Sequence, residues 1–152
     1  MNASEREIII TRTVKAPRAL LWKAWTDPAQ MDLWFGPNGY TNKTPSMDVR
    51  LGGQWKYTMT SAEGHVFENM VTYTEVSPID RLAHDHGDWQ NPKQFEAVVT
   101  FKEVEGATLV TMRSILPSKE ARDFVVKEVG AIEGGKQTLA RLEDHLRTLI
   151  NH

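Results

Sequence analysis

The chain has 152 residues, a size that fits one hydrophobic core, so we predict a single domain over residues 1–152. Its 40% hydrophobic and 25% charged residues are typical of a soluble globular protein rather than a disordered or lipid-embedded one. The net charge of -2 supplies no drive toward nucleic acid or membrane insertion, and we expect neither. Because the chain has no cysteine and its start lacks the apolar core of a signal peptide, we expect a cytoplasmic protein without disulfides.

The first third of the chain predicts a strand, two short helices and a loop. Residues 7–15 place apolar side chains on one side of an extended segment that Pro17 ends. Pro17 also suits the first turn of a helix, and the pair Asp27 and Pro28 repeats that start signal. From Gly36 to Pro45 the glycine, proline and asparagine content predicts a long loop, which we expect to be more mobile than the sheet.

From residue 46 onward the apolar residues recur with a period of two, which predicts consecutive antiparallel strands joined by short turns. The parities that collect bulky residues place Trp55, Tyr57 and Met59 inward, together with Phe95, Val99 and Phe101. We expect the strands over residues 47–50, 54–60, 65–76, 81–86, 95–101 and 109–115.

The end of the chain predicts one long amphipathic helix. After Pro117, Ser118 is a suitable cap, and apolar residues follow at spacings of three, four and seven. Gly130, Gly134 and Gly135 lie inside this helix at a cost of roughly 1 kcal/mol each relative to alanine, which predicts a kink. Together these elements predict an α+β domain whose last helix lies across the sheet.

Three stretches resemble a known family: Ala16-Pro-Arg, then Trp22-Lys-Ala-Trp-Thr-Asp-Pro with Trp34-Phe-Gly-Pro, and Asp48-Val-Arg-Leu-Gly-Gly-Gln-Trp. From about Ile8 to Leu149 the chain resembles the single-domain proteins similar to the C-terminal domain of the activator of heat-shock protein 90 ATPase, within the SRPBCC (START and birch-pollen-allergen-like) superfamily.

The resemblance implies a helix-grip fold, in which a curved antiparallel β-sheet wraps around a long C-terminal helix, with two short helices after the first strand. It also implies a cavity between sheet and helix, which in that superfamily holds hydrophobic molecules and in some members carries out chemistry. The family name implies a link to the stress response.

Two positions depart from the family pattern. Leu51 stands where members often carry proline, and Gly134-Gly135 stands where members often carry a Gly-Trp pair. An indole facing the sheet would fill cavity space, so glycine at position 135 predicts a larger pocket. We therefore expect Gly135→Trp to fill that space without lowering the melting temperature.

His84 and His86 lie two residues apart on a predicted strand, so both imidazoles share one face, which the parity of Leu82 suggests is inward. A metal would need a third ligand, and no spaced cluster supplies one, so we favour a pocket-lining polar pair and expect no metal and no cofactor.

Five other charged residues admit both catalytic and structural interpretations. For Asp48 and Arg50 we favour an ion pair that pins the following turn over an acid tuned by a cation. Glu96 is expected to face outward, whereas the pattern leaves the orientation of Glu68 and of Arg113 open.

These observations favour a protein that binds a small hydrophobic or aromatic molecule in the cavity. An enzyme of the cyclase or hydrolase type in the same cavity is the first alternative, with no catalytic residue assigned. A chaperone partner is the second, less favoured because the chain has no room for the second domain of the eukaryotic activators; a homodimer stays open. The residues predicted to contact the ligand are Trp34, Phe35, Trp55, Tyr57, Met59, Met70, His84, His86, Phe95, Val99, Phe101, Met112, Ile132 and Gly135.

Overall fold

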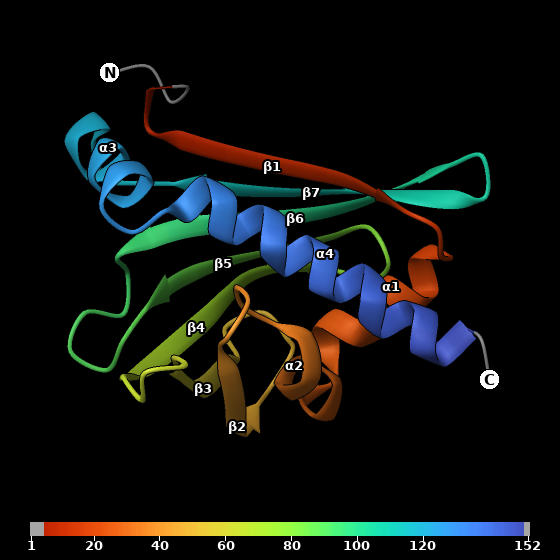
Figure 1. The fold of residues 1–152 in the computed structure, drawn as a ribbon, viewed down its shortest axis with the longest axis horizontal. Coiled ribbons are helices and arrows are strands. Elements are labelled where there is room, and N and C mark those ends of the chain that lie inside the picture. The colour runs from red at the N-terminus through yellow and green to blue at the C-terminus, as the bar shows by residue number, and fades with distance from the viewer. Residues whose placement is uncertain (1–4, 151–152) are drawn as a thin grey trace.

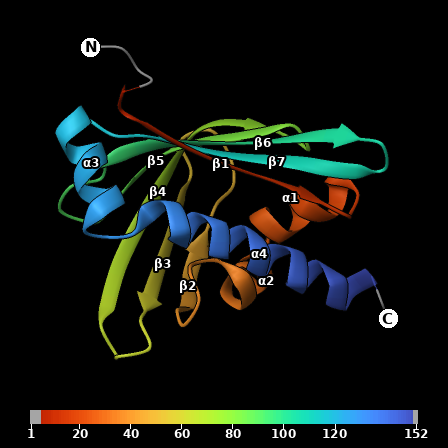
Figure 2. The ribbon, with the colours of Figure 1, turned by 45° about the horizontal axis from the view of Figure 1, so that its top comes forward.

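The computed structural model describes residues 5–150. One seven-stranded antiparallel sheet, in the order β1-β7-β6-β5-β4-β3-β2, carries the helices on one of its faces (Figures 1 and 2). This confirms the predicted α+β helix-grip architecture. The elements are β1 (Glu7–Val14), α1 (Arg18–Thr26), α2 (Pro28–Trp34), β2 (Thr41–Met47), β3 (Gln54–Thr60), β4 (Val66–Ser77), β5 (Arg81–Gly87), β6 (Phe95–Val104), β7 (Ala107–Ile115), α3 (Lys119–Lys127) and α4 (Ala131–Ile150).

The sheet is a meander from β2 to β7 that β1 extends at the far edge. Each strand of the meander pairs with the next, as the period-two pattern predicts, while β1 joins β7 with Ile10 opposite Met112. The strands β2 to β4 run steeply across the direction of β1, β6 and β7, which curves the sheet around α4 (Figure 2). The long helix therefore faces a concave surface.

Strand register decides which side chains occupy that concave face. Trp55 lies opposite Val71, and His84 lies opposite both Tyr73 and Ala97, so these residues share one face. Trp55, Tyr57, Val99 and Phe101 are buried there, which confirms the inward prediction for these four. The alternation in β4, which the sequence left open, places Phe67, Asn69, Val71 and Tyr73 inward and Glu68 and Met70 outward.

The predicted loop from Gly36 to Pro45 was wrong beyond residue 40, because residues 41–47 form β2. Proline is tolerated there since β2 is the edge strand, and its register shifts between Lys43 and Ser46. The Asp32 carboxylate of α2 accepts hydrogen bonds from the Thr44 hydroxyl (2.7 Å) and backbone N–H (3.3 Å), which holds the strand in place. The strand predicted over residues 47–50 was also wrong, because β2 ends at Met47.

The remaining loop, residues 36–40, is attached to α4. Arg141 Nη1 donates to the carbonyl oxygens of Gly36 and Pro37, each at 2.9 Å, and the Asn38 N–H donates to Gln137 Oε1 at 3.1 Å. The reason for expecting mobility, a lack of anchors, was therefore wrong. The mobility itself stays a prediction.

The final helical segment is two helices rather than one kinked helix. Ser118 caps α3 by accepting a hydrogen bond from the Ala121 N–H at 3.1 Å, as predicted. Gly130 then adopts a φ of +71°, a left-handed conformation that ends the helical path and favours glycine. Gly134 and Gly135 remain inside α4.

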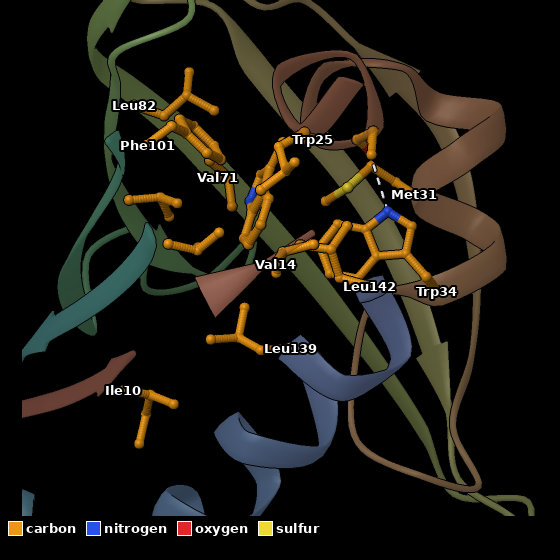
Figure 3. Close-up of a cluster of buried hydrophobic side chains, with 14 of the residues drawn as sticks. Ile10, Val14, Trp25, Met31, Trp34, Val71, Leu82, Phe101, Leu139 and Leu142 are labelled. Carbon is orange, nitrogen blue, oxygen red and sulfur yellow. Dashed lines mark hydrogen bonds between the residues drawn. The ribbon is translucent and has the colours of Figure 1, made fainter. Parts of the chain in front are cut away.

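The main hydrophobic core lies under the second half of α4, where α1 and α2 meet the sheet (Figure 3). Trp25 and Trp34 pack edge to face with ring centroids 4.7 Å apart, and the Trp34 indole N–H donates to the Ala24 carbonyl oxygen at 3.1 Å. Leu139 and Leu142 of α4 are fully buried against them. This core fixes the helix on the sheet and so positions the hollow beside it.

Candidate functional site: a cavity between α4 and the concave sheet

A cavity of about 160 Å³ lies between the first half of α4 and the concave face of the sheet. The sheet contributes residues of β1, β3 and β5 to β7, and α1 and the end of α2 contribute aromatic rings. The lining residues are Ile8, Ile10, Trp25, Phe35, Trp55, His84, His86, Phe95, Ala97, Val98, Val99, Met112, Arg113, Ser114, Ala131 and Gly135.

The cavity exists because small residues meet at this point of an otherwise bulky interface. Ala97 lies between His84 on β5 and Ser114 on β7, its register partners on the concave face. Ala131 and Gly135 line the cavity from α4. Since Ala97, Ser114 and Ala131 offer no large apolar side chain, space remains between helix and sheet beside them.

A second hollow, of about 370 Å³, adjoins the cavity and shares His86, Ala131 and Gly135 with it. Phe67 and Val129 line this hollow and are 47% and 66% exposed. The second hollow therefore connects the cavity region to the protein surface, between the β3–β4 side of the sheet and the α3–α4 junction.

Aromatic rings form one wall of the site. Trp55 and Tyr57 stack with ring centroids 4.2 Å apart, and Phe35 meets both edge-on at 5.3 and 5.8 Å. On the next part of the wall His86 stacks on Phe95 at 4.8 Å. Such a wall offers flat apolar surface of the kind that accepts another ring.

Two histidines and one tyrosine supply much of the polarity of this wall. Tyr57 Oη and His86 Nε2 share a hydrogen bond of 3.0 Å, whose direction depends on the His86 tautomer. His84 is 9% exposed, and its Nδ1 has no hydrogen-bond partner within residues 5–150. Protein atoms cover this nitrogen almost completely, and a backbone group of Asp85 lies close to the imidazole.

Burial keeps these groups uncharged at neutral pH. Desolvation, reinforced by the neighbouring His86, lowers the pKa of His84 to about 3, and desolvation lowers the pKa of His86 to about 4. Desolvation likewise raises the pKa of Tyr57 well above its usual range. The site therefore presents neutral hydrogen-bonding groups rather than an imidazolium or a phenolate.

Most of the predicted ligand-contacting residues are brought together. Phe35, Trp55, His84, His86, Phe95, Val99, Met112 and Gly135 line the cavity, and Tyr57 and Met59 line the second hollow.

Four predicted residues lie elsewhere. Trp34 and Phe101 are buried in the main core, and Met70 lies on the outward face opposite Lys56 and Gly87. Ile132 lines a separate hollow beside β1, with Arg122 and Lys136.

Sequence reasoning missed the residues that create the cavity. Ala97, Ser114 and Ala131 line the cavity but were not predicted to contact a ligand, because the sequence prediction favoured bulky and aromatic residues. A signal was present for one of them, since Ala97 occupies the inward parity of a strand whose other inward residues are Phe95, Val99 and Phe101.

Gly135 lines the cavity, as expected, but the expectation that a tryptophan there would enter free space was wrong. A Cβ built on Gly135 would lie 2.8 Å from Ile10 Cγ1, so α4 and β1 already touch at this position. The absence of a side chain lets the helix approach the strand closely, and a tryptophan there would have to displace Ile10.

The other charged candidates are structural. Arg50 Nε donates to Asp48 Oδ2 at 2.7 Å on an exposed turn, which confirms the ion pair. Glu96 faces outward, as predicted, with Lys93 3.2 Å away. Arg113 forms an ion pair with Glu7, which lowers the pKa of that carboxyl.

Two further features bear on function. Within residues 5–150, no group of three histidine, aspartate or glutamate side chains is arranged to hold a metal ion. No helix in this part of the chain is long and apolar enough to cross a membrane.

The architecture defines the class of protein: a curved antiparallel sheet gripping a C-terminal helix, with two short helices after the first strand, is the helix-grip domain of the SRPBCC superfamily. The family model described as "Activator of Hsp90 ATPase homolog 1-like protein" matches residues 15–147, and the chain belongs to this family. No curated protein matches the chain.

Solved structures share this fold over almost the whole chain. Protein Ms6760 from Mycobacterium smegmatis is 25% identical, with a TM-score of 0.87 over 97% of this chain and 95% of that one. Protein NE0264 from Nitrosomonas europaea is 24% identical, with a TM-score of 0.87 and complete coverage of both chains. An AHSA1-like protein from Aeromonas hydrophila is 19% identical, with a TM-score of 0.74 over 94% of this chain and 93% of that one.

Proposed function

We propose that the protein binds a small, predominantly apolar molecule with an aromatic ring in the cavity between α4 and the sheet. The observation that carries the proposal is the cavity itself, about 160 Å³ and bounded by Trp25, Phe35, Trp55 and Phe95. An apolar cavity of about 150 Å³ in another protein binds benzene, so the volume suits one six-membered ring.

The apolar area that a ligand buries in the cavity determines the order of magnitude of its affinity. A ring that hides about 150 Å² gains about 4 kcal/mol at about 25 cal/mol per Å². That free energy corresponds to a Kd of about 1 mM, so a single ring binds weakly. A physiological ligand with higher affinity would extend from the cavity into the second hollow, along Tyr57 and Met59.

The proposal is tested by titrating the protein with benzene and following backbone amide resonances by NMR. We expect saturable shifts at cavity residues of β5, β6 and β7, such as Val99. Ala97→Leu, which puts a larger side chain at the floor of the cavity, should weaken benzene binding at least about tenfold.

Ala62→Leu is the matched control, because it makes the same change in an exposed turn. It should leave benzene binding unchanged. If the wild-type protein shows no saturable shifts, or if Ala97→Leu folds and binds benzene as well as wild type does, the ligand does not occupy this cavity.

Catalysis in the same cavity has less support. The lowered pKa values of His84 and His86 leave both imidazoles neutral near pH 7, and a neutral imidazole is a poor general acid. The cytoplasmic location, the stress-response link, a homodimer and a chaperone contact stay predictions.

A further inference from the structure

The two edges of the sheet differ in how they are protected from pairing with another strand. β2 forms one edge and carries Pro45, a register shift between Lys43 and Ser46, and a Thr44 N–H that is bound by Asp32. Proline, lysine and irregular register are common means of keeping an edge strand from pairing with a further chain. β1 forms the other edge, contains no proline and pairs with β7 in unbroken register. β1 is therefore the less protected edge.

Hydrogen bonds at the start of β1 show which of its backbone groups point away from the sheet. The Arg6 carbonyl oxygen accepts a hydrogen bond from the Leu116 N–H at 2.9 Å, so the backbone groups of Arg6 point toward β7. Because these groups alternate along a strand, Glu7 and every second residue after it point outward. The Glu7 carbonyl oxygen does point outward, since it accepts a hydrogen bond from Arg122 Nε at 3.2 Å.

The outward groups are occupied at both ends of β1 and open between them. At the far end the Lys15 N–H donates to Glu143 Oε2 at 3.4 Å. Ile9, Thr11 and Thr13 lie between the two occupied ends, and no side chain among residues 5–150 forms a hydrogen bond with their backbone groups. All three residues are exposed, a hollow of about 250 Å³ borders the first two, and β1 runs along the upper margin of the molecule in Figure 1. This part of the edge is therefore accessible to another strand.

We propose that two copies of the chain pair through the open part of β1, antiparallel to each other and related by a two-fold axis at Thr11. This axis places Ile9 opposite Thr13 of the second copy and Thr11 opposite its own equivalent. The three open residues then all lie in hydrogen-bonded pairs, each of which exchanges two hydrogen bonds. The two sheets become one continuous sheet, and the proposal does not depend on what the cavity binds.

The occupied ends of the strand select this register. A shift by two residues in either direction would place an open residue opposite Glu7 or Lys15, whose backbone groups are already bound to Arg122 and Glu143. One of the open residues would then remain unpaired. The axis at Thr11 is the arrangement in which every open group of the described strand finds a partner.

The charges at the two ends fit the same register. Glu7 and Lys15 lie four residues before and after Thr11, on the face of β1 that also carries Ile9. Glu7 of each copy therefore lies opposite Lys15 of the other. Arg113 contacts Oε1 of Glu7, which leaves Oε2 free to face the lysine. A strand with an acid at one end and a base at the other is complementary to itself when it is turned around, which favours a second copy over an unrelated peptide.

The first test measures the oligomeric state by sedimentation equilibrium. The wild-type protein should form a reversible dimer with twice the chain mass of 17.3 kDa. Thr11→Pro removes an N–H that points outward and leaves the hydrogen bonds to β7 intact, so it should weaken the dimer at least about tenfold while the fold is retained.

Charge variants test the register. Lys15→Glu places two glutamates opposite each other at both ends and should weaken the dimer about tenfold. Lys43→Glu is the matched control, because it makes the same change at the exposed lysine of the other edge strand, β2, and should leave the dimer unchanged. Glu7→Lys should also weaken the dimer. An equal mixture of Lys15→Glu and Glu7→Lys should form heterodimers, since each end again pairs glutamate with lysine.

Hydrogen exchange supplies a readout that needs no variant. The amides of Ile9, Thr11 and Thr13 should exchange more slowly as the protein concentration rises, whereas the Ile10 amide, which faces β7, should not respond. If Thr11→Pro does not fold, Lys15→Glu and this exchange pattern decide, because the lysine side chain is exposed. A protein that remains monomeric up to about 1 mM overturns the proposal. A dimer that neither Thr11→Pro nor Lys15→Glu weakens overturns it as well, because the copies then meet through another surface.

Discussion

The two halves of α4 face the same sheet, but one half packs closely against it and the other borders a cavity. From Leu139 onward, Leu139 and Leu142 are fully buried above the sheet (Figure 3), and Leu146 is 1% exposed. In the first half, Ala131 and Gly135 face the sheet, and no residue of α4 before Thr138 is buried. Large side chains on α4 thus accompany the packed core at one end of this helix–sheet interface, and small ones accompany the cavity at the other.

This division separates the part of the interface that stabilises the fold from the part that borders the cavity. The packed half of α4 contacts α1, α2 and β1 and holds the helix in place. The half beside the cavity therefore does not have to provide the contacts that stabilise the fold. We therefore expect substitutions in the cavity lining to cost less stability than substitutions of these leucines.

The largest expected effect on stability comes from truncating a buried side chain in the packed half of α4. Leu142→Ala should lower the free energy of unfolding by about 2–5 kcal/mol, because a fully buried side chain leaves a void in a close-packed core. Met112→Ala at the edge of the cavity should cost less than half as much, since that wall already borders empty space. Urea denaturation measures both, and equal losses would show that the halves do not differ in packing.

The next effect is a dependence of stability on pH that originates in the hollow half. In the folded protein the pKa values of His84 and His86 are about 3 and 4, below the unfolded value of about 6.5, so the unfolded state binds more protons as the pH falls. Stability is therefore complete above about pH 6.5 and decreases below it, by about 1.4 kcal/mol per pH unit for each histidine.

The decrease is measured between pH 7 and pH 5, above the range in which most carboxylates titrate. His84→Leu should remove about half of the slope that the two cavity histidines produce, and the control Met112→Leu should retain the full slope. The same slope in His84→Leu as in wild type would mean that His84 is not kept neutral by burial.

Features that depend on local sequence patterns, such as the inward face of a strand or a helix cap, could be predicted from the sequence. Alternation along β3 and β6 fixed the inward side of Trp55 and Phe101, because a strand that buries one face must place its bulky residues there. The Ser118 cap was recognisable for the same reason, since its signal lies within one helical turn.

The rest depended on contacts between distant segments. Nothing local to β1 specifies its pairing with β7, and proline at position 45 looked like a loop because the edge position of β2 was unknown. The residues that form the cavity floor differ in this respect. Ala97 could have been placed inward from the parity of Phe95, Val99 and Phe101, whereas Ser114 is compatible with either face of a strand, and only the register shows that it lies beneath α4.

The smallest expected effect distinguishes two adjacent glycines in the hollow half. Both Gly134→Ala and Gly135→Ala gain up to about 1 kcal/mol of helix propensity. A Cβ at Gly134 meets Pro37 Cγ at 3.4 Å, an ordinary contact, whereas a Cβ at Gly135 lies 2.8 Å from Ile10 Cγ1. We therefore expect Gly134→Ala to be stabilising and Gly135→Ala to be less stable than it by about 1–3 kcal/mol, because Ile10 must move.

The double variant Gly135→Ala with Ile10→Ala separates this contact from other causes. If the Cβ collides with Ile10, the cost of Ile10→Ala should be smaller in the Gly135→Ala background than in wild type, by an amount comparable to the difference between the two glycine variants. Thermal or urea unfolding of the four proteins measures that coupling. Equal stabilisation by Gly134→Ala and Gly135→Ala, with no coupling to Ile10, would mean that α4 moves away from β1 without cost. The first half of the helix would then be held only through the leucines of the second half, and the width of the cavity would be set by whatever fills it rather than by contact between Gly135 and Ile10.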